Sequence, residues 1–333
     1  MGMTPFPHGL TSFGIPVFGN YPGMGKPIFC VTAKTSSDIY YNWLRQNKVP
    51  DGSIFATLNL AYADAVTGRN DTIFIFPGVH TLSADLTWAK AHTHLYGVGG
   101  PIIEGDSYTD GIVVTSGASG TTSLKTMYIT GAQNQFYGVL FEQPQAAATA
   151  VTACKVAGPS NWFKNCGFIG MMNATQDTGT TLSSLEIGPS SQYLRFEDCV
   201  IGSPLWYNRT AINGQILFSN SSAATCPQDI VFKDCRILNI SATATNPAVR
   251  LTSNYAMDRL LEFRDCTFYN FQESTGTPLT SGVFLDGCGT SHRILLTGNT
   301  AQYGWHNWAD VHTYIFCSSP AGSATGGLAI VTT

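Results

Sequence analysis

A six-residue pattern recurs along the chain at intervals of roughly thirty-odd residues. In each copy an aromatic or apolar residue is followed by a charged residue, Asn or Asp, Cys, any residue and a second apolar residue. The close copies are Phe163–Phe168, Phe196–Ile201, Phe232–Ile237 and Phe263–Phe268, and the weaker ones are Leu95–Gly99, Leu124–Ile129 and Leu296–Ala301. A repeat of this length forms one unit that buries its apolar face by stacking on its neighbours, so the pattern predicts a solenoid.

The residue types in each slot suit one rung of parallel strands. Because side chains alternate across a strand, we expect the first and last residues of each copy inside the column. The third slot favours a sharp bend, since it holds residue types that tolerate positive φ: Asn165, Asp198, Asp234, Asp265 and Gly298, with Thr126 as the one misfit. In the fourth slot we expect a buried, reduced stack of Cys166, Cys199, Cys235 and Cys266. Cβ atoms in register on parallel strands lie about 4.8 Å apart, beyond disulfide range.

A second apolar strand precedes most copies, and the two strands together predict the fold. These strands are Ala150–Cys154, Ser184–Ile187, Gln215–Phe218, Ala248–Leu251 and Gly282–Leu285, and Tyr314–Phe316 is a last one. We expect an all-β, single-stranded right-handed parallel β-helix over 29–333, with rungs over about 72–331.

A short capping helix is expected before the rungs, over about 53–67. Asp51 or Ser53 is its predicted N-cap, and Gly68 its predicted end. The predicted helix has one apolar face, which would cover the open N-terminal end of the column. This face contains Phe55, Leu58, Tyr62 and Ala65.

Residues 1–28 stand apart because they are dense in Pro and Gly and yet contain spaced aromatic residues. Proline blocks regular helix and central strand, while aromatic side chains are scarce in disordered segments. We therefore expect an extended arm that attaches to a partner or to a particle surface. Its predicted partner-binding residues are Pro5, Phe6, Pro7, Phe13, Pro16, Val17 and Phe18.

Charge and cysteine usage argue against several classes of function. Lys plus Arg total 17 against 21 Asp plus Glu, without a basic run, so nucleic-acid binding is not expected. No apolar run is long enough to span a membrane, and the N-terminus does not resemble a secretory signal. The 9 cysteines form no Cys-x-x-Cys pair, and we expect no metal and no cofactor.

Two parts of the chain resemble known families. Ile73–Leu82, Leu95–Gly100 and Ile102–Gly105 are similar to the opening rungs of the pectate-lyase-type parallel β-helix superfamily. The arm segment Thr4–Gly19, followed by a β-helix, resembles virion structural proteins of tailed bacteriophages, including head-decoration (cement) proteins. The first resemblance implies the fold, and the second implies a homotrimer on a phage particle made in the bacterial cytoplasm.

Two sets of acidic residues could carry chemistry. Polysaccharide lyases of the β-helix superfamily use a calcium-binding carboxylate cluster, for which Glu104, Asp106 and Asp110 are the candidates, although they lie among Gly and Ser as in a polar loop. Asp198, Asp234 and Asp265 should stack one rung apart, a spacing that could serve a glycosidase. Because Asn and Gly share their slot, we interpret these three as turn residues.

Histidine and loop aromatic residues provide further candidates. His92 and His94 would share a strand face and could bind a metal, although no third ligand is visible. Trp206–Arg209 and Trp305–Trp308 could bind a sugar or a partner, or pack over the column. We therefore assign no catalytic, cofactor-binding or metal-binding residue.

The favoured hypothesis is a non-enzymatic bacteriophage virion protein that decorates or cements the capsid as a β-helix trimer. Its expected partners are the major capsid protein or another virion protein, and a surface polysaccharide is a further candidate ligand. The alternative is a tailspike, receptor-binding protein or polysaccharide depolymerase, with lyase or glycosidase activity. A third reading is a secreted carbohydrate-active β-helix protein.

Overall fold

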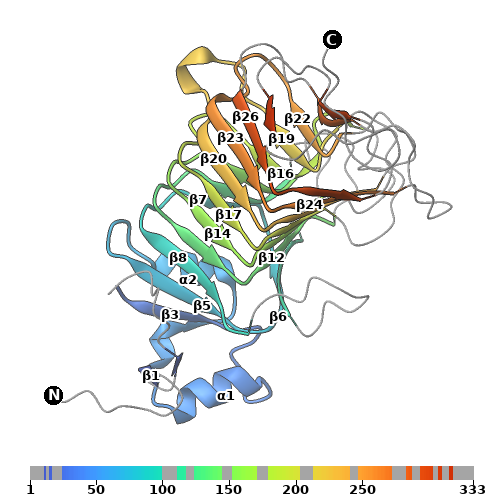
Figure 1. The fold of residues 1–333 in the computed structure, drawn as a ribbon. Coiled ribbons are helices and arrows are strands. Elements are labelled where there is room, and N and C mark those ends of the chain that lie inside the picture. Colours follow the sequence, from blue (N-terminus) through green and yellow to red (C-terminus); the bar gives the residue numbers. More distant parts are fainter. Residues whose placement is uncertain are drawn as a thin grey trace.

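Three parallel sheets, called I, II and III here, wrap around one main core in the computed structural model of the chain (Figure 1). The chain visits sheets I, II and III in turn, and each visit adds a strand beside that of the preceding rung. The all-β right-handed parallel β-helix predicted from the repeat is confirmed. The structure describes residues 11–12, 15–16, 25–99, 111–117, 124–144, 152–170, 179–202, 213–240, 247–271, 283–286, 293–302, 307–309 and 315–317.

The strands of each sheet follow one another along the column. Sheet I contains β4 (Ile54–Phe55), β3 (Pro27–Cys30), β5 (Asp71–Ile75), β8 (Thr93–Gly97), β11 (Gln135–Tyr137), β14 (Trp162–Lys164), β17 (Arg195–Glu197), β20 (Gln228–Lys233), β23 (Asp258–Arg264), β26 (Arg293–Thr297) and β29 (Ile315–Cys317). Sheet II contains β6 (Gly78–Leu82), β9 (Ile112–Ser116), β12 (Leu140–Glu142), β15 (Gly167–Ile169), β18 (Val200–Ile201), β21 (Arg236–Ile240), β24 (Thr267–Phe271) and β27 (Thr300–Gln302). Sheet III contains β7 (Leu86–Trp88), β10 (Lys125–Ile129), β13 (Thr152–Val156), β16 (Ser183–Ile187), β19 (Ile216–Phe218), β22 (Val249–Leu251), β25 (Val283–Asp286) and β28 (Asn307–Ala309).

The aromatic residues of the repeat stack inside the column. Equivalent positions on successive strands of sheet I hold Phe136, Phe163, Phe196, Phe232 and Phe263. Their ring centroids lie 4.8, 4.8, 4.6 and 4.9 Å apart in that order, with nearly parallel planes. The ring spacing thus matches the strand spacing, and the predicted stack of repeat phenylalanines is confirmed.

One of the seven predicted copies, Leu124–Ile129, is wrong. Most of that segment is β10 of sheet III, so it does not join the stack in sheet I. The copy that does so begins at Phe136, which pairs with Phe163 on the next rung. Its third residue, Gly138, has the positive φ of 67° that this slot requires. Thr126 was a misfit because the segment had been assigned to the wrong sheet.

The turn between sheets I and II confirms the roles of the third and fourth slots. Five third-slot residues have positive φ, namely 51° at Asn165, 53° at Asp198, 54° at Asp234, 54° at Asp265 and 65° at Gly298. The thiols of the fourth slot are buried and free, as predicted for Cys166, Cys199, Cys235 and Cys266. Each thiol faces the carbonyl of the stacked phenylalanine one rung below, as at Cys235 Sγ, which lies 3.4 Å from the Phe196 oxygen.

A short helix covers the N-terminal end of the core, as predicted, but it begins later than expected. α2 spans Leu58–Asp64, and its N-cap is Thr57, whose hydroxyl accepts a hydrogen bond from the Leu60 N–H. The predicted caps fail because Asp51–Ser53 forms a 3-10 turn and the next two residues, β4, pair with β3 before the helix starts.

The apolar face predicted for this helix is confirmed. The core includes Leu58, Ala61, Tyr62 and Ala65, and Phe55 of β4 packs against it. The Tyr62 ring lies 4.4 Å from the Trp88 ring inside the first complete rung. A second helix, α1 (Ile39–Gln46), was not predicted and packs through Leu44 against the outer face of sheet I.

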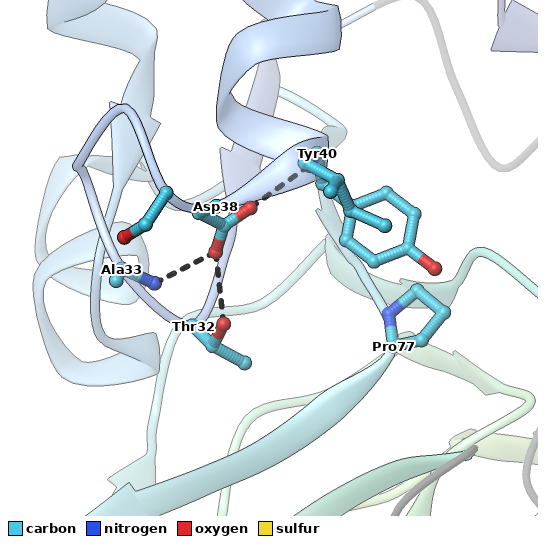
Figure 2. Close-up of a pocket in the computed structure, with 7 residues that line it drawn as sticks. Thr32, Ala33, Asp38, Tyr40 and Pro77 are labelled. Carbon is cyan, nitrogen blue, oxygen red and sulfur yellow. Dashed lines mark hydrogen bonds between the residues drawn. The ribbon is translucent and has the colours of Figure 1, made fainter.

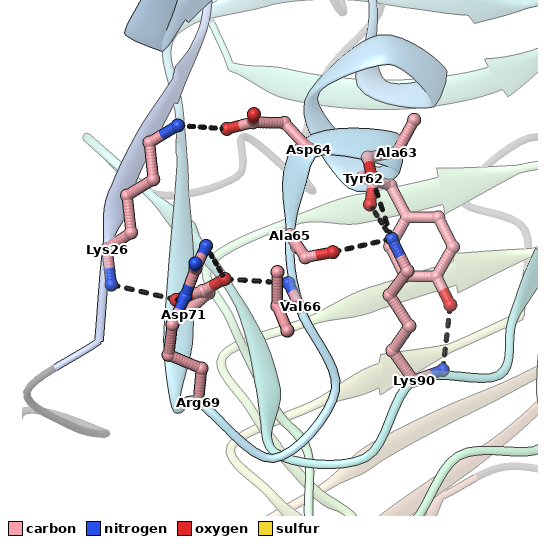
Figure 3. Close-up of polar contacts among 9 residues, drawn as sticks. All are labelled: Lys26, Tyr62, Ala63, Asp64, Ala65, Val66, Arg69, Asp71 and Lys90. Carbon is pink, nitrogen blue, oxygen red and sulfur yellow. Dashed lines mark hydrogen bonds and ion pairs between the residues drawn. The ribbon is translucent and has the colours of Figure 1, made fainter.

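A polar network joins the segments around α2 (Figure 3). The buried carboxylate of Asp71 makes a bidentate pair with Arg69, with both N–O distances at 2.6 Å. It also accepts hydrogen bonds from the backbone N–H groups of Lys26 and Val66. Burial raises the pKa of the Asp71 carboxyl, but these hydrogen bonds outweigh burial and leave the pKa below its ordinary value.

Little of the predicted arm lies within the described residues. Thr11–Ser12 (β1) and Ile15–Pro16 (β2) pair as a two-stranded antiparallel hairpin. Of the predicted partner-binding residues only Pro16 is described, through its backbone pairing; Pro5, Phe6, Pro7, Phe13, Val17 and Phe18 lie outside. Sheet I already includes Pro27 and Ile28, and the division of the chain at residue 28 stays a prediction.

Candidate functional site

The ladder of aspartates predicted from the repeat consists of turn residues. Asp198 and Asp234 have positive φ, and their side chains are 53% and 41% exposed. Their partners are neighbouring lysines, at 4.0 Å between Lys164 Nζ and Asp198 and 3.0 Å between Lys233 Nζ and Asp234. This geometry supports the turn interpretation.

Of the other predicted sets, only the histidines can be placed. His94 is buried in β8, and its Nδ1 accepts a hydrogen bond from the Gln135 N–H at 3.2 Å. Burial, and then the neighbouring His92, lower the pKa of His94 to about 4. His92 has a φ of 52° and precedes the strand, so the two rings do not share a strand face as expected.

The remaining candidates lie wholly or mostly outside the described residues, among them Glu104, Asp106, Asp110, Trp206–Arg209 and Trp305–His306. Among the residues that are described, no group of three or more His, Cys, Asp or Glu side chains could hold a metal ion. No helix in that part of the chain is both long and apolar enough to cross a membrane.

A shallow pocket beside α1 has a structural explanation (Figure 2). Its central group is Asp38, the N-cap of α1, whose carboxylate accepts hydrogen bonds from the Tyr40 and Tyr41 N–H groups. The same carboxylate accepts hydrogen bonds from the Thr32 hydroxyl and the Ala33 N–H. With its acceptor positions occupied in this way, Asp38 serves the helix cap and is a poor candidate for chemistry.

The outer face of sheet III brings together a row of residues, most of them polar, that the repeat does not explain. Neighbours in register along one outward row are Tyr128, Lys155, Glu186, Leu217 and Arg250, on strands β10 to β22. They point outward because the residues flanking them, such as Cys154 and Val156, belong to the core. Residues 145–151, 171–178, 203–212 and 241–246, which join sheet II to sheet III, lie outside the described residues.

A tight ion pair lies in the middle of this row. Lys155 Nζ and Glu186 Oε1 are 2.5 Å apart, and the two side chains are only 18% and 11% exposed. The hydroxyl of Ser219, which follows β19, donates to the same Oε1 at 2.6 Å. Both contacts fall on Oε1, so the second carboxylate oxygen can still accept a hydrogen bond from a ligand.

The ion pair continues into a cationic region around one aromatic ring. Lys125 Nζ and Lys155 Nζ lie 5.8 and 5.9 Å from the centroid of the Tyr128 ring. Asp85, beside β7, accepts a hydrogen bond from the Lys125 N–H at 2.8 Å. Burial raises the pKa of the Asp85 carboxyl. The outer face of sheet III therefore holds two carboxyl groups, Asp85 and Glu186, and two lysine ammonium groups beside the ring of Tyr128.

The sequence contains a signal for this site, namely charged residues within the apolar strands of sheet III. Lys155 and Glu186 each stand between two inward apolar residues, at the same register position on neighbouring strands. A charged residue at that point is conspicuous in a chain with only 11% charged residues. Glu186 lies in the predicted strand Ser184–Ile187, and Lys155 directly follows the predicted strand Ala150–Cys154, but neither residue was among the predicted site candidates.

Comparisons with known proteins concern the fold. A search of family models finds no match, and a search of curated proteins finds none either. Among solved structures, a pectin methylesterase from Erwinia chrysanthemi has a TM-score of 0.54 at 14% identity, covering 91% of this chain and 93% of that one. A pectin methylesterase in complex with a hexasaccharide has a TM-score of 0.53 at 14% identity, covering 86% and 82%. A protein of Geobacillus virus E2 has a TM-score of 0.41 at 13% identity, covering 80% of this chain and 57% of that one.

These comparisons correct one prediction. We expected a protein that is not an enzyme, whereas the two pectin methylesterases that share the fold at TM-scores above 0.5 are enzymes. The resemblance to the parallel β-helix superfamily agrees with the observed fold. At 14% identity the likeness establishes the fold, and the reaction has to be inferred from this chain's own residues.

Proposed function

We propose that this chain is a polysaccharide-active enzyme whose substrate lies along the outer face of sheet III, with Glu186 as the acid–base group. The observation that carries the proposal is the Lys155–Glu186–Ser219 arrangement. A partly buried carboxylate with one free oxygen is suited to taking a proton from a water molecule or a substrate. The adjacent ammonium group is suited to stabilising negative charge that develops on a substrate oxygen.

The arrangement favours ester hydrolysis over glycosidic hydrolysis. Glycosidases need two carboxylates separated by about 5 to 9.5 Å. On the described outer face of sheet III, Asp85 stands three strands from Glu186, which is about 14 Å at ordinary strand spacing. A single carboxylate beside an ammonium group can instead activate water against an ester, a reaction of the kind the name pectin methylesterase implies for the structural neighbours.

The decisive experiment replaces the proton-transfer group and keeps its shape. Purified protein would be assayed against a panel of methyl- and acetyl-esterified polysaccharides, with released alcohol, acid and reducing ends measured separately. We expect Glu186→Gln to lower turnover by about 10²- to 10⁴-fold while the protein stays folded at the assay temperature. Glu197→Gln is the matched control, because Glu197 points outward from sheet I in β17.

Three outcomes would contradict the proposal. The first is wild-type protein that releases nothing from any member of the panel. The second is a Glu186→Gln variant that keeps full turnover, and the third is a Glu197→Gln variant that loses as much activity. Release of reducing ends without alcohol or acid would redirect the assignment from ester hydrolysis to chain cleavage.

A location on a phage particle and a homotrimeric state also belong to the proposal. They rest on the composition of residues 1–28, which combines proline with spaced aromatic residues and suits attachment to a larger assembly. In this setting the enzyme would act as a tailspike that removes ester groups from a bacterial surface polysaccharide. Sedimentation of the purified chain tests the trimer, and deletion of residues 1–20 should lower incorporation into particles without changing turnover.

A further inference from the structure

Where the chain passes from sheet III into sheet I, a second column of residues has positive φ, and His92, Gln133 and Ser160 are its members on the earlier rungs. Successive rungs place Tyr193, Asp229 and Arg259 there, with φ of 54°, 51° and 59°. The Tyr193 N–H donates to the Gln228 oxygen at 2.9 Å, which places the tyrosine one rung from Asp229. Positive φ at a tyrosine or an arginine has a conformational cost that interior packing does not repay here, since both side chains are exposed.

The three side chains form a connected polar group on the surface. Arg259 Nη1 lies 3.3 Å from Asp229 Oδ2 and 3.4 Å from the Tyr193 hydroxyl. The arginine therefore spans two rungs to reach the tyrosine. The Tyr193 side chain is 51% exposed, so its ring is available to a ligand while its hydroxyl is held in place.

A second exposed tyrosine links this group to the candidate site. Tyr255 is 47% exposed, and its carbonyl accepts a hydrogen bond from Asn220 Nδ2 at 2.6 Å. The Ser253 hydroxyl donates to the Asn220 carbonyl at 2.7 Å, so two loops are joined through one asparagine. Asn220 directly follows Ser219, which binds Glu186. The loop that carries Tyr255 thus borders the outer face of sheet III.

We propose that Tyr193, Asp229, Tyr255 and Arg259 form an ancillary glycan-binding subsite along the edge between sheets III and I. This inference rests on the proposed function for the class of its ligand. A tyrosine ring offers an apolar face to the C–H face of a pyranose. The guanidinium and carboxylate offer donors and acceptors to ring hydroxyls, and their contacts at 3.3 and 3.4 Å are long enough to be exchanged for a ligand.

The subsite would hold a stretch of the polysaccharide away from the reacting unit. Each rung adds about 4.8 Å along the column, which is close to the length of one sugar unit in an extended chain. The group spans the rungs that follow Glu186, from Tyr193 to Arg259. A chain bound at Glu186 therefore meets the subsite within a few sugar units, and short substrates would not reach it.

Binding is tested with the Glu186→Gln protein, which keeps the ligand intact. A glycan array of bacterial and plant polysaccharides identifies a polysaccharide that binds, and a hexasaccharide and a disaccharide of that glycan are the titration probes. We expect Tyr193→Ala with Tyr255→Ala to raise the hexasaccharide Kd by about tenfold or more and to leave the disaccharide Kd within about twofold. Arg259→Met should raise the hexasaccharide Kd by a smaller factor.

Trp43→Ala is the control, because Trp43 is an exposed aromatic residue on α1 and lies outside the proposed subsite. Unchanged hexasaccharide affinity in the double tyrosine variant, with its fold intact by circular dichroism, overturns the subsite even if Glu186 proves essential for turnover. Equal losses for the hexasaccharide and the disaccharide, or for Trp43→Ala, also overturn it. Wild-type protein that binds no glycan on the array contradicts the subsite and the polysaccharide assignment together.

Discussion

The interior of the column and the outer face of sheet III are built on the same strands but follow opposite rules. Inside, one residue type repeats from rung to rung, as in the stack that runs from Phe136 to Phe263. Outside, the row from Tyr128 to Arg250 changes chemical character at every strand. Identical neighbours suit a packed core, because each ring meets the same shape above and below it.

A row of unlike, mostly polar residues has no such packing advantage. Lys155 and Glu186 are desolvated where they stand, and a buried ion pair contributes less to stability than apolar residues of similar size. Stability alone therefore gives little reason to place them in the middle of a sheet. The repeated residues therefore account for the stability of the column, and the proposed function is assigned to the unrepeated ones.

The largest expected effect is in the interior. Phe196→Ala removes a fully buried ring from between two stacked neighbours, and it should lower the free energy of unfolding by about 3–5 kcal/mol. Urea unfolding monitored by circular dichroism measures the change. Leu60→Ala is the control, because Leu60 is 56% exposed on α2 and should cost far less. Equal losses in the two variants would break the comparison.

A second prediction separates two carboxylates that both pair with a cation. Asp71 also accepts two backbone N–H groups, whereas the described partners of Glu186 are side chains. Asp71→Asn should therefore cost about 2 kcal/mol, because it leaves buried donors without a partner. Glu186→Gln should cost less. Chemical unfolding of both variants at neutral pH tests this order.

The pH dependence of stability checks the same distinction. The folded pKa of Asp71 lies below its ordinary value, so its stabilising contribution is complete above about pH 4 and is lost as the pH falls through the folded pKa. We expect wild-type stability to decline in that acidic range, and the Asp71→Asn variant to decline less steeply. Parallel stability–pH curves for the two proteins would show that Asp71 is not responsible.

A smaller effect is expected at the turn between sheets I and II. Asp198 has a φ of 53° and a side chain that is 53% exposed, so backbone conformation dominates its contribution. Asp198→Ala should cost about 1 kcal/mol, because alanine tolerates the left-handed region poorly. Asp198→Asn should be nearly neutral, since asparagine enters that region readily. Urea midpoints of the two variants measure the difference, and equal midpoints would contradict the turn role.

The repeated features were those that sequence could predict. A slot that recurs several times is specified by its period, and so the stack of phenylalanines, the positive φ at Asp234 and the free thiol of Cys235 were all anticipated. The copy at Phe136 was missed because Tyr137 and Val139 stand where the four close copies have a charged residue and Cys. Leu124 is followed by the charged residue Lys125, and the assignment shifted to that segment.

Features that occur once, or that depend on tertiary contact, could not be predicted from the repeated sequence pattern. α1 forms where Leu44 meets Phe29 and Phe74 on the outer face of sheet I, a contact that local periodicity does not reveal. The pairing of Lys155 with Glu186 depends on register between strands thirty-one residues apart. The column of Tyr193, Asp229 and Arg259 has no common residue type, so its shared positive φ left no pattern to find.

The smallest expected effect on stability comes from removing the candidate site as a whole. Lys155→Met combined with Glu186→Leu replaces the buried pair with apolar residues of similar volume, and the free energy of unfolding should change by less than about 1 kcal/mol or rise. Glu186→Leu alone should destabilise more than the double variant, because it leaves the Lys155 ammonium without its partner. Turnover should be abolished in the double variant and in Glu186→Leu alone.

Urea unfolding of the two single variants and the double variant gives the coupling free energy between Lys155 and Glu186. A double variant as unstable as Phe196→Ala would show that the outer face of sheet III is part of the structural core, and the assignment of function to it would fail.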